Sequence, residues 1–329
     1  MFFFKKACRI ATRQAFLLVL LALSRLASPQ EAQTPTIRVE VSRVNVGVIA
    51  TDRRGKFVEG LQKSDFHIFD NGIEQPIAGF LANDDPAQVV LMLECGPSVN
   101  LFGSQYVQKA DALIRNLARN DRIAIVCYSS TPDVQFELSE DKAAARIALR
   151  EINFHLGFGD LNLSKSLLAV LTRLENLKGK KTVVLLSSGL DSSPPVIPEE
   201  FRAKIGSIDV RVLAISTARL LTQSPKHHRR LREEKAGAAN ANIEPALESG
   251  QATLRQVAAA TGGRVYFPNS AKDFDKTYFE IAQIVRHEYN LAFAPQDFDG
   301  KLHTLIVTAN HAERVDHRQA YLAPSSSTN

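Results

Sequence analysis

The stretch "VVLMLECGPSVN", residues 89–100, decides the fold of this chain. Its first residues are apolar without a break, and the run ends abruptly in "ECGPS" at residues 94–98. A strand that is apolar on both faces is typical of a parallel sheet covered by helices on both sides. In such open sheets, ligands bind beyond the carboxyl ends of the strands. We therefore expect the loop after Leu93 to lie at a binding edge.

The same pattern continues through the centre of the chain. Continuous apolar runs predict further buried strands at residues 122–130, 181–188, 209–216 and 264–267, and "DVQFEL" at 133–138 is typical of an edge strand. Apolar residues at helical spacing predict helices at residues 104–118, 142–152, 163–177, 198–208, 251–263 and 274–289. Strands alternating with helices predict an α/β fold with a doubly wound, mostly parallel sheet and right-handed crossovers.

Both ends of the chain have a different pattern, in which apolar and polar residues alternate. The segments 36–84 and 289–324 each predict several half-buried strands, with a hairpin at Asp70-Asn71-Gly72. We predict one β-sandwich that both ends build together, with the α/β domain, residues 86–288, inserted between them. Two separate small β units are the alternative.

The first thirty residues differ from the rest of the chain. A basic start precedes the short apolar run "AFLLVLLAL" at residues 15–23, and small and polar residues follow it. This order is typical of a secretory signal peptide, so we expect residues 1–30 to direct export to the periplasm, the envelope or the exterior. The alternative is an uncleaved segment that anchors the protein to the membrane.

Removal of the signal would change the charge of the protein. Residues 1–30 hold five of the 40 Lys and Arg and none of the 35 Asp and Glu, so 35 charges of each sign remain. The pI of about 9.1 therefore belongs largely to the signal. Bulk charge gives no reason to expect nucleic-acid binding. The polar segment 222–250 is expected to be a solvated loop or a short surface helix.

Three loops should meet at the carboxyl edge of the sheet. They are "ECGPS" after Leu93, "GFGDLNLS" at residues 157–164, and "SSGLDSS" after Leu186. The order, spacing and loop positions resemble the von Willebrand factor A domain. The flanking segments 46–80 and 299–324 are similar to those of the exported bacterial group known as VWFA-related Acidobacterial domain proteins. The resemblance covers nearly all of the chain after the signal.

The resemblance implies a metal-ion-dependent adhesion site at these loops. In that family a D-x-S-x-S loop, a Thr and an Asp hold Mg²⁺ or a similar cation, which binds a carboxylate of a protein partner. A hard cation of this kind needs oxygen ligands in a nearly octahedral arrangement. The chemistry that the resemblance implies is cation-dependent adhesion without catalysis.

The first loop of this chain departs from that pattern. Glu94 stands where the first Asp is expected, and Gly96 replaces the first Ser, whereas Ser98 matches the second Ser. Cys95 is a soft ligand that does not suit Mg²⁺.

The other two loops depart as well. The Thr position falls on Leu161 or, shifted by one, on Asp160, and Ser188, next to Ser187, stands where an Asp is usual. Asp191 lies three residues further on as a substitute. We predict a degenerate site of Glu94, Ser98, Asp160 and Asp191 and expect no bound cofactor, with Mg²⁺ or another divalent cation as the alternative.

Two cysteines remain after removal of the signal. Cys95 follows the first buried strand and Cys127 ends the second, so both lie near the upper ends of neighbouring strands. Export permits a disulfide between them. A Cys95–Cys127 disulfide and two buried free thiols are both open.

We predict an exported, non-enzymatic, adhesion-type module that binds a protein partner. The partner would dock on the loops that contain Cys95, Gly96, Ser187 and Ser188, or on the segment 222–250. One alternative is a metal-free structural component of an envelope assembly, and another is an uncharacterised hydrolase. The sequence has no G-x-S-x-G, H-E-x-x-H or G-x-G-x-x-G motif, so we expect no enzyme and no small-molecule substrate.

Overall fold

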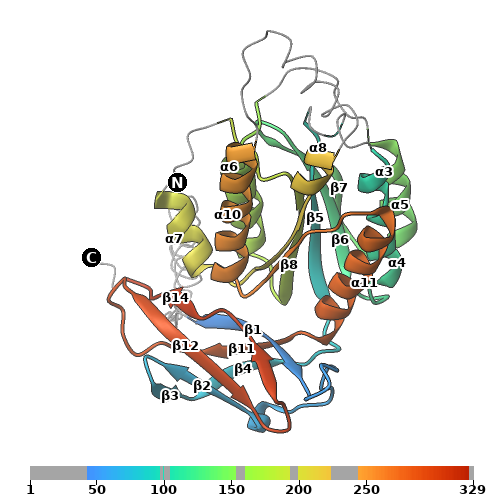
Figure 1. Ribbon diagram of the computed structural model, residues 1–329. Helices are drawn as coiled ribbons and strands as arrows, with labels where there is room; N and C mark the ends of the chain where they lie inside the picture. Colours follow the sequence, from blue (N-terminus) through green and yellow to red (C-terminus); the bar gives the residue numbers. More distant parts are fainter. Residues whose placement is uncertain are drawn as a thin grey trace, which may run out of the picture. The chain divides into compact units, whose positions relative to one another are not determined.

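The computed structural model describes residues 43–96, 99, 104–152, 160–192, 199–223 and 244–325. The predicted signal peptide and the strand expected from residue 36 lie outside the described residues, so the predicted domain boundaries stay predictions. The described chain has one six-stranded sheet and two four-stranded sheets (Figure 1). No helix among the described residues has the length and apolar character that crossing a membrane requires.

The six-stranded sheet confirms the predicted α/β class. Its strand order is β10-β9-β8-β5-β6-β7, and only the edge strand β7 runs antiparallel to its neighbour. The apolar run at residues 89–93 lies in β5, which pairs with β8 on one side and with β6 on the other. The strands are β5 (Ala87–Glu94), β6 (Arg122–Tyr128), β7 (Pro132–Ser139), β8 (Lys180–Ser187), β9 (Arg211–Ser216) and β10 (Val265–Tyr266).

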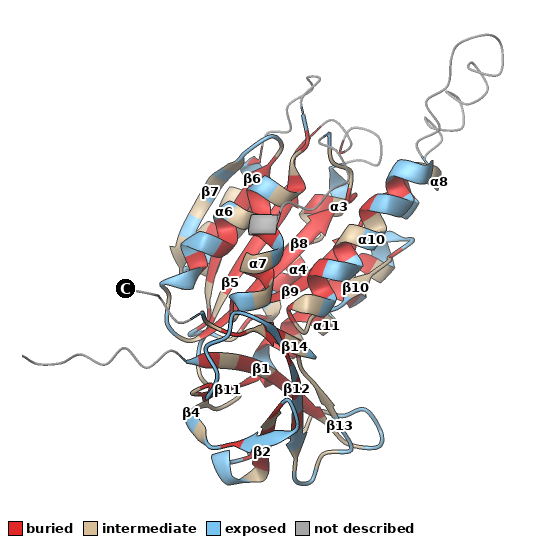
Figure 2. Ribbon diagram, turned by 90° about the vertical axis from the view of Figure 1, so that its left-hand side faces the viewer, coloured by how far each residue is buried: buried red, intermediate tan, exposed pale blue. Residues whose placement is uncertain are grey.

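Helices cover both faces of this sheet, which explains the continuous apolar runs. Along β5, Leu91 and Leu93 pack into the core of one face, and Val90 and Met92 pack into the core of the other. Figure 2 shows the strands buried between the two helix layers. On the first face lie mainly α3 (Gln105–Gln108), α4 (Asp111–Asn116), α5 (Lys142–Glu151), α8 (Ala218–Gln223) and α11 (Ala271–His287). On the second lie α6 (Leu163–Glu175), α7 (Glu199–Ser207) and α10 (Glu244–Ala260).

Two predicted helices differ from the structure. The single helix expected at residues 104–118 is divided into α3 and α4, because the amides of Ala110 and Ala112 donate to carbonyls only three residues back. Helix α10 begins at Glu244, within the segment expected to be a solvated loop or a short surface helix, and continues without a break into the helix predicted from residue 251. Pro245 lies in its first turn, where a missing N–H costs nothing, and Leu247 and Leu254 bury one face of the helix.

The ends of the chain form one β-sandwich, as predicted, and the alternative of two separate β units is wrong. Its sheets have the orders β13-β1-β11-β4 and β14-β12-β2-β3, so each sheet combines strands from both ends. The strands are β1 (Val44–Thr51), β2 (Phe66–Asp70), β3 (Ile73–Gln75), β4 (Ile77–Leu81), β11 (Tyr289–Phe293), β12 (Leu302–Ala309), β13 (Arg314–Asp316) and β14 (Ala320–Leu322), with a 3-10 turn at Lys63–Asp65. The predicted hairpin joins β2 to β3, with Asn71 and Gly72 at φ 48° and 83°.

A polar cluster lies in the otherwise apolar sandwich. The carboxylate of Asp70 contacts the ring of His303 (Oδ1 to Nδ1, 2.8 Å) and accepts from the hydroxyl of Tyr321 (2.7 Å), while Asp299 contacts the other ring nitrogen at 3.2 Å. Burial acts to lower the pKa of His303, but the hydrogen bonds and charges of the two carboxylates raise it above its ordinary value. The two carboxylates therefore favour the protonated ring, and the cluster connects β2, β12 and β14.

Buried charges join the sandwich to the inserted domain. Arg211 at the start of β9 donates from Nε to Oε1 of Glu288 at 2.7 Å, and both side chains are buried. Glu288 leaves so little room that a Cβ on Gly47 of β1 would lie 2.2 Å from its Oε1. Arg318 donates to the carbonyls of Ile208 (3.0 Å) and Asn45 (2.9 Å), and burial lowers its pKa to about 10.

Removing one partner of the buried pair should destabilise the fold. Arg211→Met leaves Glu288 as a buried charge without its cation, and we expect a loss of about 3–5 kcal/mol in the free energy of unfolding. The double variant Arg211→Met with Glu288→Leu should regain part of that loss, because the buried carboxylate is removed together with its cation, whereas buried Lys180 loses the nearby charge of Glu288. Urea unfolding of the three proteins measures both effects. A double variant no more stable than the single one would contradict the expectation.

Candidate functional site

The candidate site is built around the carboxylate of Glu94, at the end of β5. Glu94 is only 1% exposed, so its carboxylate needs hydrogen-bond donors from the protein. Ser188, directly after β8, supplies two of them. Its backbone N–H donates to Oε2 at 2.7 Å, and its hydroxyl oxygen lies 2.9 Å from Oε1 and 2.8 Å from Oε2.

Two further hydroxyls also approach the carboxylate of Glu94. The hydroxyl of Tyr128 lies 3.2 Å from Oε2, and that of Ser187 lies 3.3 Å from it. These two hydroxyls are 2.6 Å apart, and Ser187 also accepts from the amide of Gly189 at 2.9 Å. One oxygen of Glu94 thus faces a converging set of donors on β6 and on the loop after β8.

Tyr128 is the residue that the sequence interpretation missed. Burial and then the negative charge of Glu94 raise the pKa of its phenol well above the ordinary value, and the charge of Asp191 acts in the same direction. The phenol is therefore protonated at neutral pH and able to donate. No local sequence pattern marked this residue, because its role depends on the strand register, which places Tyr128 at the end of β6 directly opposite Glu94.

Gly96 and Leu161 occupy the places where the resemblance expects hydroxyl ligands. They lie in contact, because a Cβ on Gly96 would be 2.6 Å from Cδ2 of Leu161. Leu161 is itself buried. A serine at residue 96 would therefore need the leucine to move. An apolar contact thus replaces two oxygen ligands of the implied site.

The three loops at this edge of the sheet are tied together. The amide of Leu161 donates to the hydroxyl of Ser192 at 2.9 Å, and the amide of Ser192 donates to the carbonyl of Leu161 at 2.7 Å. A Cβ on Gly189, which has φ +78°, would lie 2.6 Å from the carbonyl carbon of Gly250. Glycine is therefore required where the loop after β8 touches α10.

The predicted acidic residues are placed differently from one another. Asp160 is exposed, Asp191 is half-buried, and Glu94 is fully buried, while Ser98 lies outside the described residues. In the described part of the chain, no three His, Cys, Asp or Glu side chains gather closely enough to hold a metal ion. A Mg²⁺ site needs oxygens whose lone pairs face the cation. Here the hydroxyls of Ser187 and Ser188 face a carboxylate instead, so the described residues do not fit such a cation.

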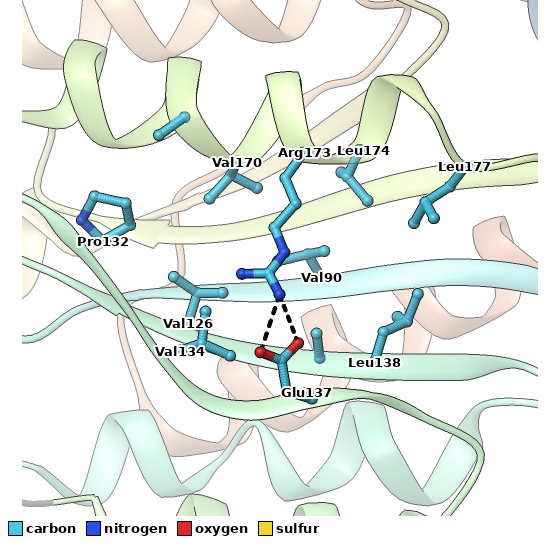
Figure 3. A pocket seen from close by; sticks show the side chains of 12 residues that line it. Val90, Val126, Pro132, Val134, Glu137, Leu138, Val170, Arg173, Leu174 and Leu177 are labelled. Atoms are coloured by element: carbon cyan, nitrogen blue, oxygen red, sulfur yellow. Dashed lines mark hydrogen bonds and ion pairs between the residues drawn. The ribbon is translucent and has the colours of Figure 1, made fainter.

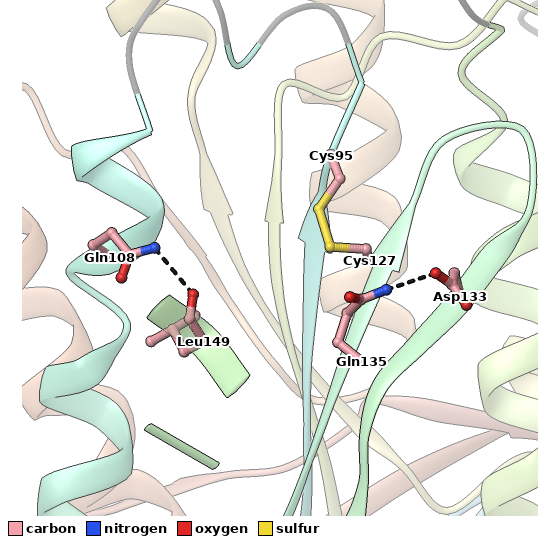
Figure 4. The surroundings of a disulfide bond; sticks show 6 residues. All are labelled: Cys95, Gln108, Cys127, Asp133, Gln135 and Leu149. Carbon is pink, nitrogen blue, oxygen red and sulfur yellow. Dashed lines mark hydrogen bonds between the residues drawn. A yellow bond between two sulfur atoms is a disulfide. The ribbon is translucent and has the colours of Figure 1, made fainter. Parts of the chain in front are cut away.

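Cys95 and Cys127 lie on the opposite face of the sheet from this network. Both pack into the core that contains Leu91 and Leu93. The two cysteines are joined by a disulfide in the structure, with 5.5 Å between their Cα atoms (Figure 4). The bond would fix the root of the first loop to β6, next to the backbone bond from Cys95 N–H to the carbonyl of Tyr128 at 2.9 Å.

Comparison with known proteins gives matches to solved structures only. No protein-family model and no curated protein matches the chain. The matching structures include a von Willebrand factor type A protein from Catenulispora acidiphila, with 13% identity and a TM-score of 0.44 over 88% of this chain and 76% of that one. They also include the PilB minor pilin from Streptococcus sanguinis, with 13% identity and a TM-score of 0.43 over 66% of this chain and 65% of that one.

A third match is an aerotolerance-related membrane protein from Bacteroides fragilis, with 12% identity and a TM-score of 0.44 over 60% of this chain and 98% of that one. A von Willebrand factor A protein is thus among the matches, as the resemblance in the sequence predicted. At these identities and TM-scores the matches carry no conclusion about function. The fold follows from the order and direction of the strands in the structure.

Loss of one hydroxyl from the network should destabilise the protein. Ser188→Ala removes a donor from the buried Glu94 carboxylate and should lower the free energy of unfolding by about 2 kcal/mol. Urea unfolding measures the change. Ser207→Ala, on an exposed serine at the end of α7, is the matched control and should leave stability nearly unchanged. Equal effects of the two substitutions would contradict a special role for Ser188.

The disulfide between Cys95 and Cys127 can be tested by counting thiols. Purified, unreduced protein from an oxidising compartment should give no reactive thiol from these two residues after denaturation, and two after reduction. Mass spectrometry of an unreduced digest should recover the two cysteines in one linked peptide pair. Two free thiols in the unreduced protein would exclude the bond.

Proposed function

We propose that this chain is an exported, non-enzymatic module that binds a protein partner through the loops at the carboxyl edge of its central sheet, without a metal ion. The observation that carries the proposal is the set of donors around Glu94. Where the resembled family uses acidic and hydroxyl oxygens to hold a cation, this chain uses hydroxyls to hold an acid. These bonds fix the described part of the loop after β8 to the end of β5.

Other features support the same function. The loop after β8 is fixed to α10 at Gly250 and, through Ser192, to Leu161 of the second loop, which gives a partner a preformed surface. The N-terminal sequence supports export. Among the described histidines, His67, His287 and His303 are paired with carboxylates in or beside the sandwich, which lies at the other end of the central sheet from the network around Glu94 (Figure 1).

Rebuilding the implied metal site should create cation binding that the natural chain lacks. The variant carries Glu94→Asp, Gly96→Ser, Leu161→Thr and Ser188→Asp, so that a second acid and two hydroxyls return and the leucine no longer fills their space. Isothermal titration calorimetry with Mg²⁺ and Mn²⁺ should show saturable binding by this variant and none by the natural chain. The matched control retains Ser188 and carries only the other three substitutions.

Partner capture tests the function itself. Immobilised protein should retain the same partner from envelope extract with and without EDTA, and exchange of Gly189 for Val should abolish retention by displacing the loop after β8. Capture that EDTA abolishes, or saturable Mg²⁺ binding by the natural chain that Glu94→Ala removes, would overturn the metal-independent mechanism. Retention unaffected by Gly189→Val in a folded protein would move the interface away from these loops.

A further inference from the structure

A hollow lies between the edge strand β7 and helix α6, along the second face of the central sheet. Its volume is about 190 Å³, and its walls are almost entirely aliphatic (Figure 3). The lining side chains include those of Val90, Ala124, Val126, Val134, Leu138 and Leu174. This hollow is separate from the network around Glu94.

Irregular pairing of β7 explains why the hollow exists. The register between β6 and β7 shifts on both sides of Ile125, which pairs with Phe136. As a result Phe136 packs against the core of the first face, whereas Val134 and Leu138 pack against the core of the second face. No aromatic ring from β7 therefore covers Ala124, and the helix opposite, α6, lines the hollow with Ala169, Val170, Arg173 and Leu174.

An ion pair crosses the mouth of the hollow. Nη2 of Arg173 on α6 lies 3.0 Å and 2.9 Å from the carboxylate oxygens of Glu137 on β7, and the side chains are 65% and 70% exposed. An exposed pair of this kind contributes at most about 1 kcal/mol, so it opens easily. Within the described residues, Nε and Nη1 of Arg173 make no hydrogen bond, and these donors are available at the mouth.

We propose that this hollow binds a small amphiphile, with an aliphatic or aromatic body inside and an oxygen acceptor held by Arg173 at the mouth. A dry apolar cavity of about 150 Å³ admits benzene, so this one has room for a body of slightly larger size. The walls recognise the body through apolar burial. The free guanidinium donors recognise the acceptor, most strongly a carboxylate. The ligand is bound without being chemically changed.

Octanoate and 1-octanol are suitable probes, because they share an alkyl chain and differ in the charge of the head. Calorimetry or ligand-observed NMR with the purified chain should show one saturable site for octanoate. Ala124→Leu fills the hollow and should abolish binding, whereas Ala143→Leu, an exposed alanine on α5, should leave it unchanged. Arg173→Met should weaken octanoate about tenfold and leave octanol unchanged.

Because Ala124→Leu could fail to fold, Ala169→Leu serves as a second filling variant. Ala169 is exposed on α6 and lines the same hollow, so a leucine there should block the hollow without disturbing the sheet. Absence of saturable binding of either probe, or binding that survives both filling substitutions, would overturn the proposal. Octanol binding without octanoate binding would overturn the assigned role of Arg173. These measurements need no protein partner, so their failure would leave the function proposed for the loops at the carboxyl edge intact.

Discussion

The buried carboxylate of Glu94 is the constraint on which the upper edge of the sheet depends. A charge at the end of a central strand, shielded from water, is tolerated only when donors converge on it. Ser187, Ser188 and Tyr128 come from two different neighbouring strands to meet this need. By doing so they fix the loop after β8 relative to β5 and β6. The position of the loop after β8, which is part of the proposed binding surface, therefore depends on the hydrogen bonds that the buried carboxylate of Glu94 accepts.

The departures from the metal-binding pattern are coupled in pairs. The family pattern has an acid at each of the positions of Glu94 and Ser188, whereas this chain has one acid and one hydrogen-bond donor. The longer side chain of Glu94 reaches the loop after β8 and accepts from Ser188 there. At the positions of Gly96 and Leu161 the family pattern has hydroxyl ligands, whereas this chain has an apolar contact. The side chain of Leu161 fits there because Gly96 has no Cβ. Because these contacts are complementary, the described residues at this edge form a packed structure of their own.

Much of the fold could be predicted from the sequence because it rests on local patterns. The continuous run in β5 and the alternation in β12 report how many faces of a strand are buried. The carboxyl-edge position of Glu94, Ser187 and Ser188 follows from the same patterns. The role of Tyr128 could not be predicted, because it depends on which residue of β6 lies opposite Glu94. The start of α10 was missed because Pro245 and Gly250 are residues that usually interrupt helices. The structure shows why a glycine occurs at residue 250, since a Cβ there would collide with the backbone of Gly189.

The pairing of strands within the sandwich has a consequence for biosynthesis. Strand β11 lies between β1 and β4, so both of these early strands lack a ladder partner until the last part of the chain has been made. Contacts over such sequence separations form slowly, and unpaired strand edges invite association with other chains. During synthesis from the N-terminus, those edges stay unpaired until residue 293 has been made. A product that ends before β11 would therefore leave the ladder positions of β1 and β4 beside β11 empty.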